Sequence, residues 1–135
     1  MKQLIKTLKI KTSGQGFYEF TSDIVKLVNK IKNGLLTIYV KHTSCSLLIQ
    51  ENADSDVQKD LLNFFSKIVP ENKNYIHQSE GPDDMPAHIK SALTQTSLSI
   101  PIENFEITLG TWQGIYLFEH RKSSHTRKIK LHLID

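Results

Sequence analysis

Several features are scarce in this 135-residue chain, and each scarcity excludes a class of protein. The lone cysteine, Cys45, excludes an internal disulfide framework and favours a reducing compartment. The first twelve residues interleave apolar side chains with lysines, and no apolar run of signal-peptide or membrane-spanning length follows. The 17 basic residues are interspersed with 14 acidic ones, so no basic stripe for nucleic acid forms. We therefore expect a soluble, cytoplasmic protein that binds neither membranes nor nucleic acid.

Common catalytic and metal-binding motifs are also absent. The sequence contains no HExxH, no cysteine pair with zinc spacing, no phosphate-binding P-loop and no DDxxD. Any metal or phosphate chemistry must therefore come from residues that the fold brings together.

The length predicts one domain spanning residues 1–135, with a sizeable core. Apolar residues at period two predict a half-exposed first strand. Further short strands are expected at 17–20, 35–40, 45–50, 98–102, 105–109, 115–118 and 129–133. Because strands dominate, we expect an α+β domain with antiparallel or mixed sheets in a sandwich-like arrangement with two to three helices.

Helical spacing predicts where those helices lie. The first should follow Thr21 and Ser22, which could cap it, and should end at Asn33-Gly34. The second should run from about residue 54 to 68 and the third should begin near Pro86, with Asp83 or Asp84 at its cap. The second helix should have a buried stripe made of Val57, Leu61, Leu62, Phe65 and Ile68.

The segment HTSCS follows a strand predicted to be buried. His42 continues the apolar face of that strand, and Thr43 and Ser44 come directly after it. Their hydroxyl and backbone N–H groups can bind an oxyanion, while the imidazole can bind a metal or move a proton. A strand bend with locally satisfied hydroxyls explains the same residues. Cys45 is more typical of a small buried side chain than of a nucleophile.

Two acidic segments come next. Asp54 suits the cap of the long helix, whereas capping explains Glu51 and Asn52 less well. The second segment concentrates potential metal ligands in a dozen positions: His77, Glu80, Asp83, Asp84 and His88. Asp84 and His88 are four residues apart and could share a helical face, although a solvated acidic loop before a short helix is the alternative.

The segment GTWQGIYLFEHR is the densest polar cluster. Its two glycines bracket Gln113 and allow a tight turn or bulge. Glu119 and Arg121 continue one face of the following strand, and His120 lies on the other. Arginine is a good bidentate partner for a carboxylate or phosphate, although a simple Glu119–Arg121 pair on an exposed strand end would explain both residues.

Taken in order, five motifs closely resemble the YjbQ family, which is described as secondary thiamine-phosphate synthases. They are HTS (42–44), ENAD (51–54), EGPDDMPAH (80–88), SLSIP (97–101) and GTWQGIYLFEHR (110–121). The resemblance covers nearly the whole chain. It implies a mixed-sheet α+β fold that assembles as a homotrimer, with histidines near subunit interfaces.

The resemblance also implies an activity and a site. The activity is weak joining of hydroxymethylpyrimidine diphosphate to thiazole phosphate, with release of pyrophosphate. The implied metal or phosphate ligands are His42, His88 and His120. The candidate acid/base or metal-supporting groups are Glu51, Asp54, Asp84 and Glu119. The expected contacts to the phosphorylated ligand are Thr43, Ser44, Gln113 and Arg121.

We expect a divalent metal, which could be Zn, Mg or Mn, and a small phosphorylated molecule as partner. Two other functions use the same residues. One is a metal- or phosphate-binding module without turnover, and the other is a metal-dependent phosphoester hydrolase.

Overall fold

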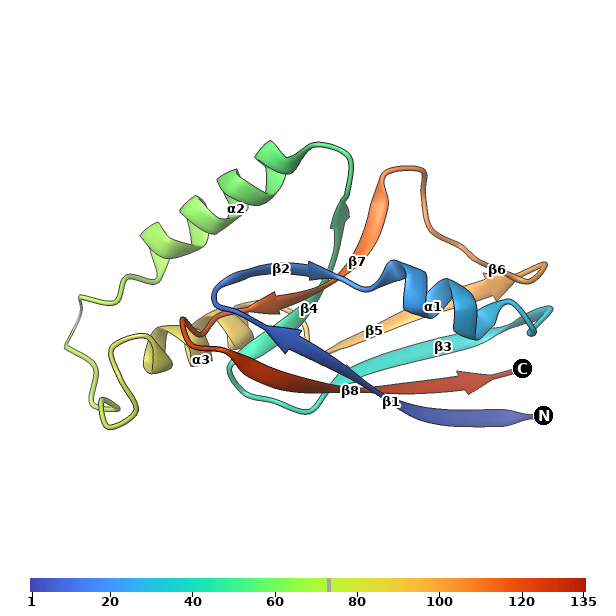
Figure 1. Ribbon diagram of the computed structural model, residues 1–135, viewed down its shortest axis with the longest axis horizontal. Helices are drawn as coiled ribbons and strands as arrows, with labels where there is room; N and C mark the ends of the chain where they lie inside the picture. The colour runs from blue at the N-terminus through green and yellow to red at the C-terminus, as the bar shows by residue number, and fades with distance from the viewer. Residues whose placement is uncertain (73) are drawn as a thin grey trace.

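The computed structural model describes residues 1–72 and 74–135, which form three helices and two antiparallel sheets (Figure 1). The helices are α1 (Thr21–Val28), α2 (Ser55–Ile68) and α3 (Asp84–Leu93). The strands are β1 (Gln3–Thr12), β2 (Gly16–Glu19), β3 (Asn33–Val40), β4 (Cys45–Glu51), β5 (Ser97–Glu103), β6 (Glu106–Ile107), β7 (Gln113–Glu119) and β8 (His125–Ile134). The predicted α+β class is confirmed.

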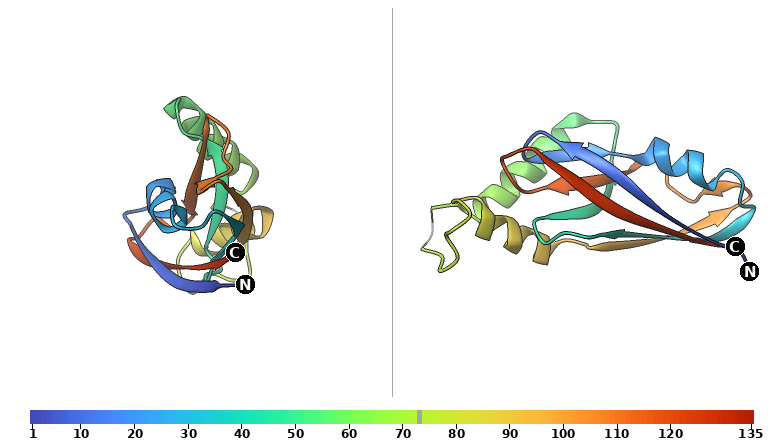
Figure 2. Two further views of the ribbon diagram at one scale, coloured as in Figure 1. Left: turned by 90° about the vertical axis from the view of Figure 1, so that its right-hand side faces the viewer. Right: turned by 60° about the horizontal axis from the view of Figure 1, so that its bottom comes forward.

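The larger sheet has the strand order β1-β8-β3-β5-β6, and the smaller has the order β2-β7-β4. Every strand pair among the described residues is antiparallel. The first strand, β1, lies at an edge of the larger sheet. Figures 1 and 2 show α2 and α3 at one end of the molecule and both chain ends at the other. No helix in the described part of the chain is long and apolar enough to cross a membrane.

One core lies between the two sheets. Alternate residues of β3, β5 and β8 face it, as period two requires, and Ile115 and Leu117 of β7 meet them from the smaller sheet. Ile24 and Val28 of α1 are also fully buried in this core. The opposite face of β7 contacts α2, where the rings of Phe65 and Phe118 meet edge to face at 5.3 Å.

Two predicted features of α1 are wrong. The helix ends at Val28, and its first turn has no side-chain cap, because the Thr21 hydroxyl accepts a hydrogen bond from the Ile115 backbone N–H instead. Asn33 and Gly34 begin β3 rather than ending a helix. A Cβ at Gly34 would lie 2.3 Å from the Ile134 carbonyl oxygen, so this glycine permits close approach of β3 and β8.

Two further predictions need correction. The strand predicted at 105–109 is only the two-residue β6, because Asn104 and Phe105 have positive φ and form the turn after β5. The α2 bounds match the prediction, but none of its residues is fully buried and Ile68 is 49% exposed. The helix therefore covers the small sheet as an outer layer rather than entering the core.

Candidate metal centre and the surrounding polar groups

A cluster of two imidazoles and one carboxylate lies at the start of α3. Asp84 and His88 are one helical turn apart on the same face, and His77 reaches them from the preceding loop. The His77 and His88 Nε2 atoms lie 2.6 and 3.1 Å from the same oxygen, Asp84 Oδ2. One potential ligand atom from each of the three residues lies within 4.8 Å of the others. Two nitrogen ligands and one oxygen ligand suit zinc or manganese.

The orientation of His88 is fixed by a second hydrogen bond. Its Nδ1–H donates to the Thr43 carbonyl oxygen at 2.9 Å. A neutral imidazole carries one N–H, so the Nε2 of neutral His88 presents a lone pair to the Asp84 carboxylate. Two electron-rich atoms at 3.1 Å repel unless a proton or a metal cation lies between them. This geometry fits a metal ligand whose other nitrogen is held by the backbone.

Arg121 fixes the carboxylates from the other side. Its guanidinium donates to Asp83 Oδ2 at 3.0 Å, to Asp84 Oδ1 at 2.6 Å and to the Glu80 carbonyl oxygen at 2.9 Å. Burial alone would raise the pKa of Asp84, but the His77 hydrogen bond and the Arg121 charge outweigh burial, so the pKa is lowered. The guanidinium therefore orients the cluster with three of its five N–H groups, and the predicted contact of Arg121 with a phosphate stays a prediction.

A second polar group surrounds Glu119, whose side chain is fully buried. Its carboxylate pairs with Arg127 at 2.5 Å and accepts a 2.6 Å hydrogen bond from the Thr12 hydroxyl. It also accepts the backbone N–H groups of His120 and Arg121. Burial alone would raise the pKa of Glu119, but the bonds from Arg127 and Thr12 outweigh it and lower the pKa. The simple alternative of an exposed Glu119–Arg121 side-chain pair is wrong.

His42 and Ser44 adjoin this buried pair. Arg127 donates to the Ser44 hydroxyl at 3.0 Å, and the Lys128 backbone N–H donates to His42 Nε2 at 2.8 Å. The Nε2 lone pair of His42 is therefore already engaged. His42 also borders a pocket of about 260 Å³ together with Thr43 and His88. Burial raises the pKa of the nearby Cys45 thiol to about 12, which keeps this thiol protonated.

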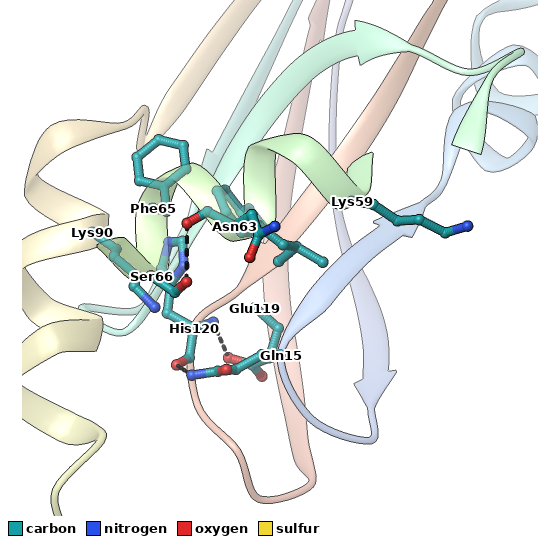
Figure 3. Close-up of a pocket in the computed structure, with 10 residues that line it drawn as sticks. Gln15, Lys59, Asn63, Phe65, Ser66, Lys90, Glu119 and His120 are labelled. Atoms are coloured by element: carbon teal, nitrogen blue, oxygen red, sulfur yellow. Dashed lines mark hydrogen bonds between the residues drawn. The ribbon is translucent and has the colours of Figure 1, made fainter. Parts of the chain in front are cut away.

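His120 lies in a separate pocket of about 460 Å³ between α2, α3 and the end of β7 (Figure 3). Its Nε2 contacts the Ser46 hydroxyl at 2.9 Å, which in turn contacts the Thr94 hydroxyl at 2.6 Å. Burial lowers the pKa of His120 to about 3, and the charge of Lys90 acts in the same direction. This imidazole is therefore neutral near pH 7.

The remaining predicted residues lie at the far end of the small sheet. Glu51 pairs with Gln113 at one end of the β4–β7 ladder, whereas Cys45 pairs with Glu119 at the other. At about 3.3 Å per residue, the two ends are roughly 20 Å apart. Asp54 caps α2 by accepting a hydrogen bond from the Asp56 backbone N–H at 2.9 Å. The Gln113 side chain accepts the Gly110 N–H within its own turn.

Sequence reasoning placed His88 and Asp84 in the cluster, and it included His77 only among several possible ligands. It missed Arg127 and Lys90, although the pattern held a signal for each. Arg127 falls at period two with the buried face of β8, and Lys90 falls three residues after the buried Ala87. A charged residue on an apolar face indicates a buried partner or a ligand.

Comparison with known proteins agrees with this architecture. A family model for "UPF0047 protein YjbQ-like" matches residues 6–135. A UPF0047 protein of Synechocystis is 50% identical, with 98% of this chain and 92% of that protein covered. The UPF0047 protein YjbQ of Escherichia coli O157:H7 is 43% identical, with 92% of each chain covered.

Solved structures show the same fold. A YjbQ/UPF0047 family protein of Clostridium acetobutylicum superposes with a TM-score of 0.88 at 36% identity, covering 96% of this chain and 99% of that one. A conserved hypothetical protein of Thermus thermophilus gives 0.86 at 30% identity, covering 96% and 99%. With sequence and fold in agreement over nearly the full length, this chain belongs to the UPF0047 YjbQ-like family.

Proposed function

We propose that the protein is a divalent-metal-dependent enzyme acting on a phosphorylated small molecule, with His77, Asp84 and His88 as the metal ligands. One observation carries this proposal: two imidazole nitrogens face a single oxygen of Asp84, whose side chain is 2% exposed. Three protein ligands are typical of catalytic zinc sites, in which a further position is left for water or substrate.

The surrounding residues have clear supporting roles. Arg121 orients one carboxylate oxygen of Asp83 and one of Asp84, and the Thr43 carbonyl holds His88 in the tautomer that a metal requires. The adjoining pocket, bordered by His42, Thr43 and His88, lies where a substrate would contact the cluster. A divalent ion there would supply positive charge to stabilise a departing diphosphate.

The reaction we propose joins hydroxymethylpyrimidine diphosphate to thiazole phosphate and releases pyrophosphate. It is supported by the resemblance of the HTS, EGPDDMPAH and GTWQGIYLFEHR motifs to a family described by that activity. A reaction that displaces a diphosphate needs cationic charge at the leaving group, and the proposed metal centre supplies it.

We further propose that the protein works as a homotrimer. The loop that carries His77 leaves the neighbouring Ile76 fully exposed, beside an apolar hollow formed with Tyr75 and Met85. A second copy of the chain covering this hollow would shield both the apolar side chain and the metal cluster. Ile76→Asp should therefore shift the mass measured by light scattering from trimer to monomer, and an unchanged mass would contradict this interface.

The metal and the reaction are tested by the same set of variants. We expect His77→Ala, Asp84→Asn and His88→Ala each to weaken Zn²⁺ or Mn²⁺ binding in calorimetry by at least about tenfold. They should also abolish thiamine phosphate formation. His132→Ala is the matched control, because His132 lies on β8, away from the cluster, and its only side-chain hydrogen bond among the described residues is to Gln3.

The possible outcomes separate the two parts of the proposal. Metal binding that survives all three substitutions would overturn the assigned ligands. Metal binding without thiamine phosphate or pyrophosphate release would keep the metal centre and overturn the reaction.

A further inference from the structure

The pocket that contains His120 has an unusual composition for the inside of a protein. It lies beneath α2, shares no residue with the His77–Asp84–His88 cluster, and has a volume of about 460 Å³. Figure 3 shows Lys90 extending from α3 toward His120, with Asn63 and Ser66 of α2 beside them. The lining therefore combines two lysines and one carboxylate, Glu119, with neutral polar groups.

Lys90 is buried without a partner. The residue is 7% exposed, and no hydrogen bond or ion pair holds its ammonium within residues 1–72 and 74–135; the Nζ atom itself is not fully buried but opens onto the pocket. The nearby acids are already paired, since Glu71 binds Lys122 at 2.7 Å and Asp83 binds Arg121 at 3.0 Å. An ammonium at the mouth of a mostly buried side chain is only partly hydrated, and burial lowers the pKa of Lys90, so an anion in the pocket would stabilise its charge.

His120 is the second buried group with unused hydrogen-bonding capacity. The residue is 1% exposed, its Nε2 contacts Ser46, and its Nδ1 has no partner among the described residues. Glu119 also borders the pocket, but its two oxygens are occupied by Thr12, Arg127 and two backbone N–H groups. This carboxylate therefore does not neutralise Lys90 within the pocket.

Part of the wall is apolar. Phe65 and Phe118 meet edge to face, and Leu62 of α2 adds an aliphatic side chain. A ligand with only a charged group, such as inorganic phosphate, would leave this apolar surface uncovered. A ring or short aliphatic body would cover it.

We propose that this pocket is a binding site for a small organic anion, with its phosphate or carboxylate group at Lys90 and His120 and its apolar body against Phe65 and Phe118. The anion would supply the acceptor that the Lys90 ammonium lacks. The site is separate from the proposed metal centre, so the two bind their ligands through different residues.

Calorimetric titration with phenyl phosphate, benzoate and inorganic phosphate tests this site. We expect phenyl phosphate or benzoate to bind at least about tenfold more tightly than inorganic phosphate, because only the first two have a ring. The tighter of the two identifies the preferred anion. Absence of binding for both up to about 10 mM, or equal affinity for inorganic phosphate, would overturn the proposal.

Lys90→Met removes the charge but keeps the length of the side chain. We expect it to weaken binding of the organic anion by at least about tenfold and to leave the unfolding temperature the same or higher, because a partly desolvated charge without a counter-charge is gone. A lysine with a purely structural role would give a lower unfolding temperature. Lys67→Met is the matched control, since Lys67 is an exposed residue of α2 outside the pocket.

Zn²⁺ titration of the same proteins keeps the two sites apart. Both variants should bind Zn²⁺ as the unmodified protein does. Anion binding that is unchanged in Lys90→Met would overturn the anion site, whatever happens at the metal centre.

Discussion

The Glu119–Arg127 pair and the His77–Asp84–His88 cluster both place a carboxylate out of water, yet their hydrogen bonds differ. Every partner of Glu119 is a donor: a guanidinium, a hydroxyl or a backbone N–H. Asp84 Oδ2 instead faces two imidazole nitrogens, one of which presents a lone pair when His88 is neutral. The first carboxylate is complete within the chain, whereas the second needs a further proton on His88 or a metal cation. Burial alone therefore does not distinguish a structural carboxylate from one in a ligand site. The number of N–H and O–H donors that face the carboxylate does.

The largest effect is expected when one member of the Glu119–Arg127 pair is replaced. Glu119→Gln should lower the free energy of unfolding by about 3–5 kcal/mol, because it leaves Arg127 buried without a counter-charge. Urea denaturation measures this loss. The double variant Glu119→Leu with Arg127→Met should recover most of it, since an apolar pair of similar size needs no compensation. A single variant as stable as the unmodified protein would contradict the structural role.

Metal binding at the His77–Asp84–His88 cluster should stabilise the folded protein. Free Zn²⁺ at 100 times its dissociation constant should raise the free energy of unfolding by about 2.7 kcal/mol, and chelation should reverse the gain. Thermal unfolding with and without EDTA measures this change. At the same Zn²⁺ concentration the gain should fall to about 1.4 kcal/mol or less in His77→Ala and persist in His132→Ala. An equal gain in both variants would place the metal elsewhere.

His120 should make the protein sensitive to acid. The unfolded chain protonates this imidazole near the ordinary pKa of 6.5, whereas the folded chain does so only at a pKa of about 3. The unfolded state therefore takes up the proton first as the pH falls, and stability is lost below pH 6.5. The loss is about 1.4 kcal/mol per pH unit, or about 2 kcal/mol between pH 6.5 and 5.

Urea midpoints at these two pH values test the assignment. Between pH 6.5 and 5, the His120→Gln variant should lose about 2 kcal/mol less stability than the unmodified protein. His42, whose pKa is also lowered by burial, acts in both proteins and cancels in the comparison. Equal losses in the two proteins would show that His120 is not the source.

The smallest effect concerns a carboxylate outside both regions. Asp54→Ala should cost about 1 kcal/mol through loss of the α2 cap, whereas Asp54→Ser should cost a few tenths. Denaturation measures both, and Zn²⁺ affinity should stay unchanged because Asp54 contacts the Asp56 backbone rather than the cluster. A loss of Zn²⁺ affinity in both variants would move Asp54 from a cap to a site residue.

The strands could be predicted because their patterns are local. Leu36, Ile38 and Val40 alternate as a half-buried strand requires, and β3 contains all three. Gly34 was misassigned because its role depends on Ile134, which is one hundred residues away in the sequence. The exposure of α2 likewise depends on how much of the small sheet it covers, which helical periodicity does not encode.

The candidate site shows the same limit. The spacing of Asp84 and His88 follows from helix geometry and was visible in the sequence. The pairing of Glu119 with Arg127 rather than with Arg121 depends on the β7 and β8 strands leaving the turn between them in different sheets. Lys90 was overlooked because a lysine on a short helix is usually solvated.

The pairing of β1 with β8 has a consequence for how the chain folds. Ten residues of the first strand pair with ten of the last, so the large sheet cannot close until nearly the whole chain is present. Such non-local pairing is typical of slow folding, in milliseconds to seconds. Until then β1 is an unpaired strand, and Lys6, Lys9 and Lys11 along it oppose pairing with a second nascent chain. These lysines thus protect the strand during synthesis, before they become part of an edge.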